Sequence, residues 1–326
     1  MQMFRRECIE THCVGALWPE FLGRVELGES FAIETKGNLA NGPIYVSGIK
    51  AGEPIAVHIE AIDINGPFTA PNGGPFVEGM GAPVPLEYRD GYFYFPRHFR
   101  LKANPSVGNV AVLPEPSDEI LEMSREVSHA GKTWKNETGW RRVVNDPRGK
   151  HCHQDSAALT AGAAIHLKAQ VDGAGLCLAD VHGYIGEGEL AWDGVAADAS
   201  VQVRVERSKG WLVDWPLIET ANEIMVCSSY TSSYALRPQL KYVDVVREAY
   251  RALRDVVAAK IGGTIEDANT IVATAADLRN CALYGLGEGY IPQQKDFPPY
   301  DIAVVAALSK HVFADEPAGR RARREG

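Results

Sequence analysis

The chain has 326 residues, 45% of them hydrophobic and 23% charged, which allows a large buried core and excludes an intrinsically disordered protein. The formal net charge is −9 and the only basic cluster is at the very end, so nucleic acid and anionic membranes are not expected partners. With neither a signal peptide nor a membrane-spanning stretch, the sequence predicts a cytoplasmic protein. The six cysteines are widely spaced without a CxxC pair, which favours reduced thiols.

Short runs of alternating apolar and polar residues predict β-strands in the first third of the chain. Residues 43–49 (PIYVSGI) and 54–64 (PIAVHIEAIDI) are two such runs. Residues 65–85 are rich in Gly and Pro without an apolar period, which predicts a long irregular loop, and residues 114–149 predict a similar one. Loops of this length often line binding sites, although a plain surface excursion is an equal alternative.

The second half of the chain changes from strands to helices. Four strands are predicted, at residues 164–171, 173–182, 186–195 and 199–207. Residues 243–263 have helical apolar spacing and end in Gly-Gly, and Thr264 is the expected N-cap of a second helix with Asp267 in its first turn. This order predicts an α+β protein that is mainly β.

We expect one structural unit over residues 1–315. It would be β-rich over residues 1–236, with a site hairpin at 174–195, and helical over 241–280. Residues 316–326 (EPAGRRARREG from 316 onwards) predict a disordered tail.

An unusual concentration of acids follows the apolar strand, at residues 179–190 (ADVHGYIGEGEL). Strand alternation puts Asp180 and His182 on one face, and a turn at GYIG would place Glu187 and Glu189 opposite them. Carboxylates this close repel each other by roughly a few kcal/mol. A divalent cation between them would remove the repulsion. The alternative is a solvated, acid-lined strand end in which one glutamate is protonated.

A further ligand could come from residues 149–162 (GKHCHQDSAALTAG). His151, His153 and Asp155 would face one way if this segment is extended, although Asp155 could instead cap the next turn. Cys152 between two histidines is a candidate nucleophile, but strand neighbours point to opposite faces and would not reach its sulfur. The hydroxyl-rich segment 227–234 (CSSYTSSY) leaves a serine amidase open, without a GxSxG motif.

Taken together, several segments resemble the acetamidase/formamidase family. They are residues 37–59 (GNLANGPIYVSGIKAGEPIAVHI), 104–117 (NPSVGNVAVLPEPS), 150–195 and 266–280 (EDANTIVATAADLRN). The most specific feature is a DxHxxxGxGE string, residues 180–189, after an Asp-containing LTAG segment. The resemblance extends from about residue 11 to residue 313.

The resemblance implies an antiparallel β-sandwich or barrel-like core with C-terminal helices. It also implies an amidohydrolase of linear amides, in which a metal-activated water releases ammonia and a carboxylate from a small primary amide such as formamide or acetamide. The implied cofactor is a divalent metal, zinc first, with manganese or calcium as alternatives. The implied metal ligands are Asp155, Asp180 and His182, with Glu187 and Glu189 as catalytic residues.

Two histidines are candidate substrate-binding residues on the same grounds. His12 matches a histidine that often opens the family's sequences, and His153 stands where the family has Asn. Other departures are His151-Cys152 in place of Gly-Gly, Ile185 in place of Gln, and Glu187 in place of Asp. Because these departures change the rim of the site, another amide and a non-catalytic metal-containing or amide-binding protein are alternatives. By analogy we expect a homo-oligomer, a dimer or larger.

Overall fold

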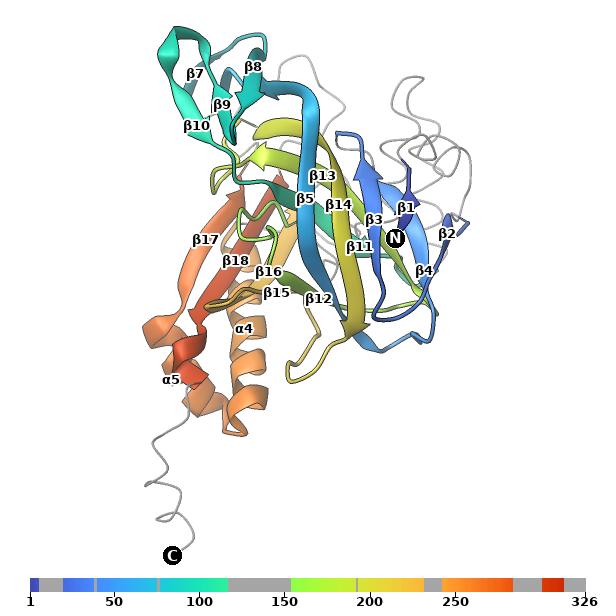
Figure 1. Cartoon of the computed structure of the whole chain (residues 1–326). Coiled ribbons are helices and arrows are strands. Elements are labelled where there is room, and N and C mark those ends of the chain that lie inside the picture. Colours follow the sequence, from blue (N-terminus) through green and yellow to red (C-terminus); the bar gives the residue numbers. More distant parts are fainter. Residues whose placement is uncertain are drawn as a thin grey trace, which may run out of the picture.

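The computed structural model describes residues 1–5, 20–37, 40–74, 77–116, 154–191, 193–231, 242–283 and 301–313. These residues form a mainly β fold with two α-helices near the C-terminal end, as expected (Figure 1). Most strands join one large sheet, in which β1 pairs with β3 and β2 with β4 in parallel and the other pairs are antiparallel. The expected tail at 316–326 lies outside the described residues.

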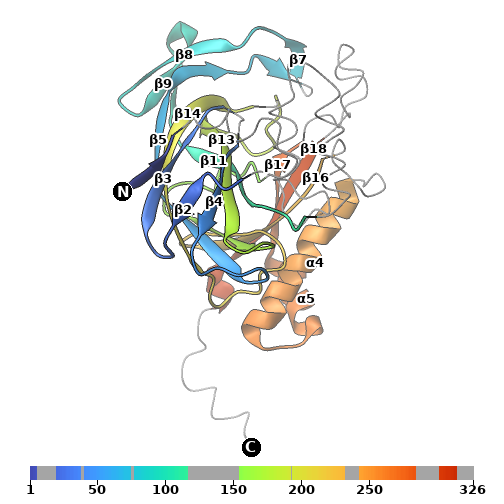
Figure 2. The same cartoon turned by 90° about the vertical axis from the view of Figure 1, so that its right-hand side faces the viewer.

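The first half of the chain supplies eleven of the described strands. They are β1 (Gln2–Phe4), β2 (Gly23–Val25), β3 (Ser30–Thr35), β4 (Asn41–Val46), β5 (Pro54–Ala70), β6 (Gly73–Gly74), β7 (Val77–Met80), β8 (Val84–Arg89), β9 (Tyr92–Tyr94), β10 (Arg100–Lys102) and β11 (Ser106–Val112). A short 3-10 helix, η2 (Pro96–His98), connects β9 with β10. Strands β7 to β10 form an arm at one end of the molecule, remote from the helices (Figures 1 and 2).

The second half contributes the remaining described elements. They are β12 (Ala164–Lys168), β13 (Ala174–Tyr184), β14 (Val195–Arg207), β15 (Leu217–Glu219), β16 (Glu223–Thr231), α4 (Tyr242–Ile261), α5 (Ile265–Ala275), β17 (Asp277–Ala282), β18 (Asp301–Ser309) and the 3-10 helix η4 (Lys310–Phe313). None of the helices in the described part of the chain combines the length and the apolar character that crossing a membrane requires.

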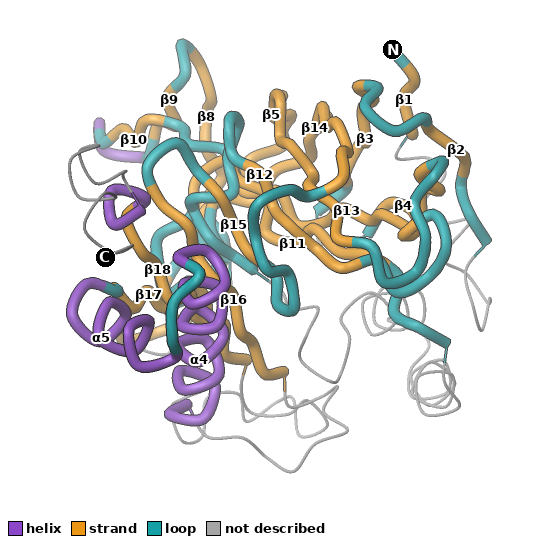
Figure 3. Tube along the Cα trace, turned by 90° about the horizontal axis from the view of Figure 1, so that it is seen from below, coloured by secondary structure: helices purple, strands orange, loops and turns teal. Residues whose placement is uncertain are grey.

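The described residues form two large hydrophobic cores and two small clusters. The larger core lies between β3, β4, β5, β11, β13 and β14 and continues over one face of β12, β15, β16, β17 and β18. The second packs α4 and α5 against β16 and β18, with both helices on one side of these strands (Figure 3). Thr264 caps α5 as expected, since its hydroxyl accepts from the Asp267 amide and the Asp267 carboxylate accepts from the Thr264 amide. The three described cysteines, Cys177, Cys227 and Cys281, are free and buried, which agrees with reduced thiols.

Strand β13 is central to the larger core. Ten consecutive residues, Ala174 to Gly183, are buried, because β11 pairs with one edge while β4 and then β14 pair with the other. A strand enclosed in this way reads as a nearly continuous apolar run, which explains GAGLCLA in the sequence. The polar residues Asp180 and His182 therefore enter a protein interior.

Two predictions of local structure are wrong. Residues 65–85 are not an irregular loop, because β5 continues to Ala70, where it pairs with β14 and β8, and β6 to β8 follow. Residues 186–195 are not a strand; β13 is followed by turns, and its partner is β14, which begins at Val195. Sheet pairing compensates for weak local propensity in the first case, and three glycines favour turns in the second. The expected loop at 114–149 lies almost entirely outside the described residues.

Candidate metal centre

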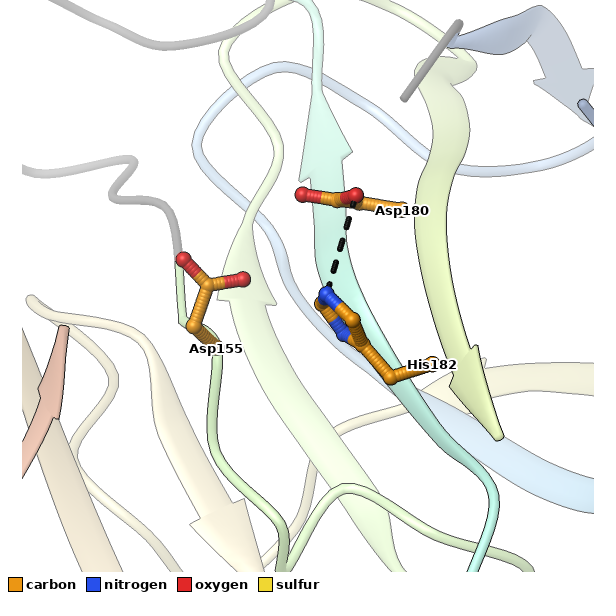
Figure 4. Close-up of side chains that lie close together, drawn as sticks. All are labelled: Asp155, Asp180 and His182. Atoms are coloured by element: carbon orange, nitrogen blue, oxygen red, sulfur yellow. Dashed lines mark ion pairs between the residues drawn. The ribbon is translucent and has the colours of Figure 1, made fainter. Parts of the chain in front are cut away.

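The candidate site lies near the end of β13, where Asp180 and His182 enter from the strand. Residue pairing places His182 beside Ser106 of β11 and Ala196 of β14. Asp180 has the left-handed backbone angle φ of 64°, so its carboxylate departs from regular strand geometry. The two side chains nevertheless approach each other, with 3.9 Å between His182 Nε2 and Asp180 Oδ1 (Figure 4).

Asp155 reaches the same place from a segment that is hydrogen-bonded to β11. The amides of Gln154 and Asp155 both donate to the Gly108 carbonyl, at 3.1 and 2.9 Å. The Gln154 side chain accepts from the Val110 amide at 2.8 Å and donates to the Val110 carbonyl at 3.2 Å. Because β11 also pairs with β13, these hydrogen bonds place the Asp155 carboxylate close to Asp180 and His182 (Figure 4).

These residues belong to what we call the carboxylate–histidine cluster: Asp155, Asp180, His182, Glu189 and Asp193. Ligand atoms of Asp155, Asp180 and His182 lie within 4.8 Å of one another, and so do those of His182, Glu189 and Asp193. His182 Nε2 is 3.5 Å from Glu189 Oε1 and 3.3 Å from Asp193 Oδ1. One imidazole is thus common to two groups of carboxylates.

The cluster is enclosed except at Asp193. The side chains of Asp180, His182 and Glu189 are 8%, 1% and 2% exposed, against 36% for Asp193. Burial by itself lowers the pKa of His182, but the carboxylates of Asp193, Glu189 and Asp180 outweigh it, so the pKa lies well above the usual range. Two carboxylates at 4.8 Å, the upper limit of the separations within each group, repel by about 3.5 kcal/mol at an effective dielectric constant of 20. The cluster therefore favours a positive charge in its centre.

The backbone around the cluster is strained. Asp155, Asp180 and Glu189 have φ angles of 43°, 64° and 41°, which side chains other than Gly, Asn and Asp seldom adopt. Each costs roughly 1–2 kcal/mol, more for Glu than for Asp. Such strain persists where the surrounding structure enforces it, and it often accompanies functional sites.

Gly108 provides the space in which the cluster assembles. A Cβ atom at this position would lie 2.6 Å from Asp155 Oδ1, 2.7 Å from the Asp180 carbonyl and 3.1 Å from His182 Cε1. Any larger residue would push two cluster members away. The glycine in the segment NPSVGNVAV is thus required by close approach and not by an unusual backbone angle.

Glu187 lies on another side of the site. It is exposed as a residue, yet burial of its carboxyl raises the pKa, while a hydrogen bond with the Cys281 thiol and the charge of Arg279 oppose that shift. Burial and the Glu187 charge in turn raise the pKa of Cys281 well above its usual value, against a hydrogen bond with Ser156. The Cys281 thiol of β17 therefore separates Glu187 from the Asp155 segment.

The donor set fits a divalent cation. Neither ring nitrogen of His182 has a hydrogen-bond partner among the described residues, although this side chain is almost fully buried. An imidazole with several carboxylate oxygens is a ligand set suited to zinc or manganese. Within the described residues, Asp155, Asp180 and His182 would hold the ion, and Glu189 and Asp193 stand near enough to complete its coordination.

The structure brings together most of the site residues expected from sequence. Asp155, Asp180, His182 and Glu189 converge, whereas Glu187 faces Cys281 instead of pairing with His182 as predicted. His12, His153, His151 and Cys152 lie outside the described residues. Sequence reasoning did not identify Asp193, although it follows the motif by four residues, or Cys281, which has no local signal because its contacts are made between distant strands.

Two serines of the hydroxyl-rich segment are described, and neither is exposed. Ser228 and Ser229 are buried in β16. Ser228 donates to Glu248 at 3.3 Å.

Solved structures identify the class of fold. An acetamidase from Yersinia enterocolitica superposes with a TM-score of 0.70 and 19% identity, covering 96% of this chain and 93% of that one. An acetamidase from Bacillus halodurans gives 0.67 and 19%, with 90% and 93% covered. A gamma lactamase from Delftia acidovorans gives 0.53 and 15%, with 98% and 96% covered. The chain therefore has the fold of these proteins.

A family model matches one part of the chain. Residues 96–237 match the Acetamidase/Formamidase family, which confirms the resemblance indicated by the sequence motifs. The matched region includes β11, the Asp155 segment and the whole carboxylate–histidine cluster. The match supports amide hydrolysis as the general class of reaction. No curated protein sequence matches the chain significantly.

Proposed function

We propose that this protein is a metal-dependent hydrolase of a small primary amide, from which it releases ammonia and a carboxylate. The observation that carries the proposal is the convergence of Asp155, Asp180 and His182 in the interior of a fold whose relatives are named acetamidases. Buried carboxylates around one imidazole do not by themselves stabilise a fold, because removing charges from water costs free energy.

A divalent cation bound by Asp155, Asp180 and His182 would supply a positive centre that polarises the amide carbonyl and lowers the pKa of water. Zinc is the first candidate, with manganese or calcium as alternatives. Asp193 is the most exposed member of the cluster, and we propose that a substrate would enter past it.

Glu187 is the residue we assign to proton transfer. Part of the Glu187 residue is exposed, and burial of its carboxyl raises the pKa, which favours a group that can carry a proton, while Glu189 is enclosed beside His182. Glu187 would accept a proton from the attacking water and deliver it to the departing nitrogen, which is the ordinary task of a general acid–base group. Glu189 would then hold His182 and the cation in position. His12 and His153 stay candidates for substrate contacts.

The first experiment combines metal analysis with an ammonia-release assay. Protein purified without added metal is analysed for bound ions and assayed with formamide, acetamide, longer linear amides and a γ-lactam. The proposal expects bound metal and turnover of at least one linear primary amide, lost on chelation. Metal without turnover would favour the non-catalytic alternative, and turnover that resists chelation would contradict the proposal.

Two glutamine variants separate the roles of the glutamates. Glu187→Gln should keep its metal and lose roughly 10²–10⁴-fold in kcat, the usual contribution of a general acid–base group. Glu189→Gln should lose metal affinity as well. An exposed glutamate of the arm, Glu87, provides the control variant Glu87→Gln. Full activity in Glu187→Gln would end that assignment.

The expected homo-oligomeric state and cytoplasmic location are also proposals. Size-exclusion chromatography with light scattering tests the first, and cell fractionation tests the second.

A further inference from the structure

A second polar cluster lies outside the candidate metal centre. We call it the serine–histidine–glutamate cluster, after Ser208, His166 and Glu219. His166 of β12 is 4% exposed. Its Nδ1 is 2.7 Å from the Ser208 hydroxyl, just after β14, and its Nε2 is 3.0 Å from Glu219 Oε2 at the end of β15. A hydroxyl, an imidazole and a carboxylate in this order are the parts of a serine nucleophile and its base.

The tautomer of His166 follows from its partners. An ionised carboxylate only accepts hydrogen bonds, so Nε2 carries the hydrogen that Glu219 accepts. Nδ1 of the neutral ring is then an acceptor, and the Ser208 hydroxyl donates to it. The hydrogen bond from His166 lowers the pKa of Glu219 to about 2, with burial opposing and Lys310 and Trp211 contributing further. The carboxylate therefore stays ionised across the physiological range.

Surrounding contacts hold these three residues in place. Trp211 Nε1 donates to Glu219 Oε2 at 2.9 Å, and Lys310 Nζ donates to Oε1 at 2.7 Å. The Ser208 amide donates to the Pro54 carbonyl of β5 at 2.9 Å. Glu219 thus uses both oxygens on fixed partners, which orients the imidazole towards the hydroxyl.

The serine–histidine–glutamate cluster is remote from the candidate metal centre. Strand β14 begins beside His182, which pairs with Ala196, and ends beside β5, where Arg207 pairs with Ile55. About 12 residues of extended chain separate Ala196 from Ser208, on the order of 40 Å at the strand rise. The two clusters therefore lie at opposite ends of the long strand β14 (Figure 1).

We propose that Ser208 is an acyl-accepting nucleophile, with His166 as its general base and Glu219 as a positioning residue, that reacts with small activated esters. Ser208 is half-buried between exposed neighbours on both sides, residues 206, 207, 209 and 210, so a small acyl donor can approach it. This site is independent of the proposed amide hydrolysis.

The reaction is balanced without any further reagent. Ser208 Oγ forms a bond to the ester carbonyl carbon as its proton passes to His166 Nδ1, and the leaving alkoxide takes that proton as its bond to carbon breaks. Water then attacks the acyl carbon and gives one proton to Nδ1, and as the bond between the acyl carbon and Oγ breaks, Oγ takes that proton from Nδ1, which leaves Ser208 and a carboxylic acid. Esters suit the site better than amides because an alkoxide is a better leaving group than an amine anion.

The test is covalent labelling of the full chain with a fluorophosphonate probe, read by peptide mass spectrometry, together with hydrolysis of 4-nitrophenyl acetate. We expect one label per chain, on Ser208, whether or not a chelator is present. Ser208→Ala should remove it. The matched control is Ser47→Ala. Ser47 is also half-buried, but its hydroxyl donates directly to the Glu26 carboxylate at 2.9 Å and not to a histidine.

The rate and the pH profile of Ser208 labelling test the roles of His166 and Glu219 separately. His166→Gln should slow labelling of Ser208 by roughly a hundredfold or more, as loss of a base does. Glu219→Gln should slow it comparably and alter its pH profile, since an amide can donate to Nε2 and favour the wrong tautomer. Absence of label on Ser208 in folded protein, checked by circular dichroism, overturns the proposal, and so does undiminished labelling in folded His166→Gln.

Discussion

His182 and His166, the two histidines that are buried in the described part of the chain, have opposite surroundings. Both ring nitrogens of His166 lie within 3.0 Å of hydrogen-bond partners, and the one carboxylate beside it is also bound by Lys310. Neither nitrogen of His182 forms a hydrogen bond within the described chain, and Nε2 faces three carboxylates at 3.3–3.9 Å. One cluster is balanced in charge, and the other gathers negative charge around one imidazole.

These surroundings indicate which polar cluster needs an external ion. A half-buried carboxylate bound by an ammonium, an indole and an imidazole, as that of Glu219 is, is satisfied by the protein itself. Buried carboxylates that converge on an imidazole are stable only if a proton or a cation joins them.

Neutralising Asp180 should have the largest effect. Asn is nearly isosteric and tolerates the left-handed φ of 64°, so Asp180→Asn removes the charge with little change in shape. We expect a loss of metal affinity and ammonia release beyond the roughly 10–100-fold that loss of an outer partner costs. Isothermal titration with zinc and the amide assay measure it. Asp172→Asn, at an exposed aspartate that binds Lys50, is the control, and equal metal affinity in both variants would contradict the assignment.

Filling the space at Gly108 should disrupt the metal centre through geometry alone. The added methyl of Gly108→Ala would lie 2.6 Å from Asp155 Oδ1 and 2.7 Å from a carbonyl oxygen, so Asp155 must move. We expect metal affinity to fall by roughly tenfold or more while the serine–histidine–glutamate cluster keeps its labelling. Gly186→Ala is matched, because a Cβ there meets nothing within 4 Å. Unchanged metal binding in Gly108→Ala would show that the cluster does not need this space.

The serine–histidine–glutamate cluster should contribute to the stability of the folded protein in a way that is lost in acid. The pKa of Glu219 is lowered from 4.5 to about 2 in the folded protein, so its stabilising contribution is complete above pH 4.5 and is lost as the pH falls towards 2. The contribution is on the order of 2–3 kcal/mol. Denaturant unfolding between pH 7 and pH 2 should show a smaller loss for Glu219→Gln than for the unmodified chain. The same acid dependence in both would contradict the prediction, with Glu87→Gln as the control.

Asp193 should matter least within the cluster. Its side chain is 36% exposed, so water can replace part of what its carboxylate supplies. Asp193→Asn should weaken metal binding by about tenfold, the lower end expected for an outer partner, and leave the fold intact. Titration with zinc and thermal unfolding measure the two effects. A loss as large as that of Asp180→Asn would make Asp193 a principal ligand.

Several elements were readable from sequence because their signals are local. The strand at 173–182, the helix at 243–263 and the Thr264 cap all depend on residues within one or two turns or on alternation along one strand. The sequence also predicts that Asp180, His182 and Glu189 lie close together, because the three lie within ten residues. The predicted strand at GEGEL is wrong, since this segment forms turns and β14 is the strand that pairs with β13.

Other features exist only through contacts between distant segments. The pairing of β5 with β14 makes strands of a Gly- and Pro-rich sequence, and β17 brings Cys281 to Glu187. Ser208, His166 and Glu219 come from three strand ends without a shared motif. The strand and helix pattern, the acidic motif and the family resemblance can be read from the amino-acid order, because periodicity and spacing act over short range. Which charges share a buried space depends on the folded chain, because burial and charge balance follow from sheet pairing between distant segments.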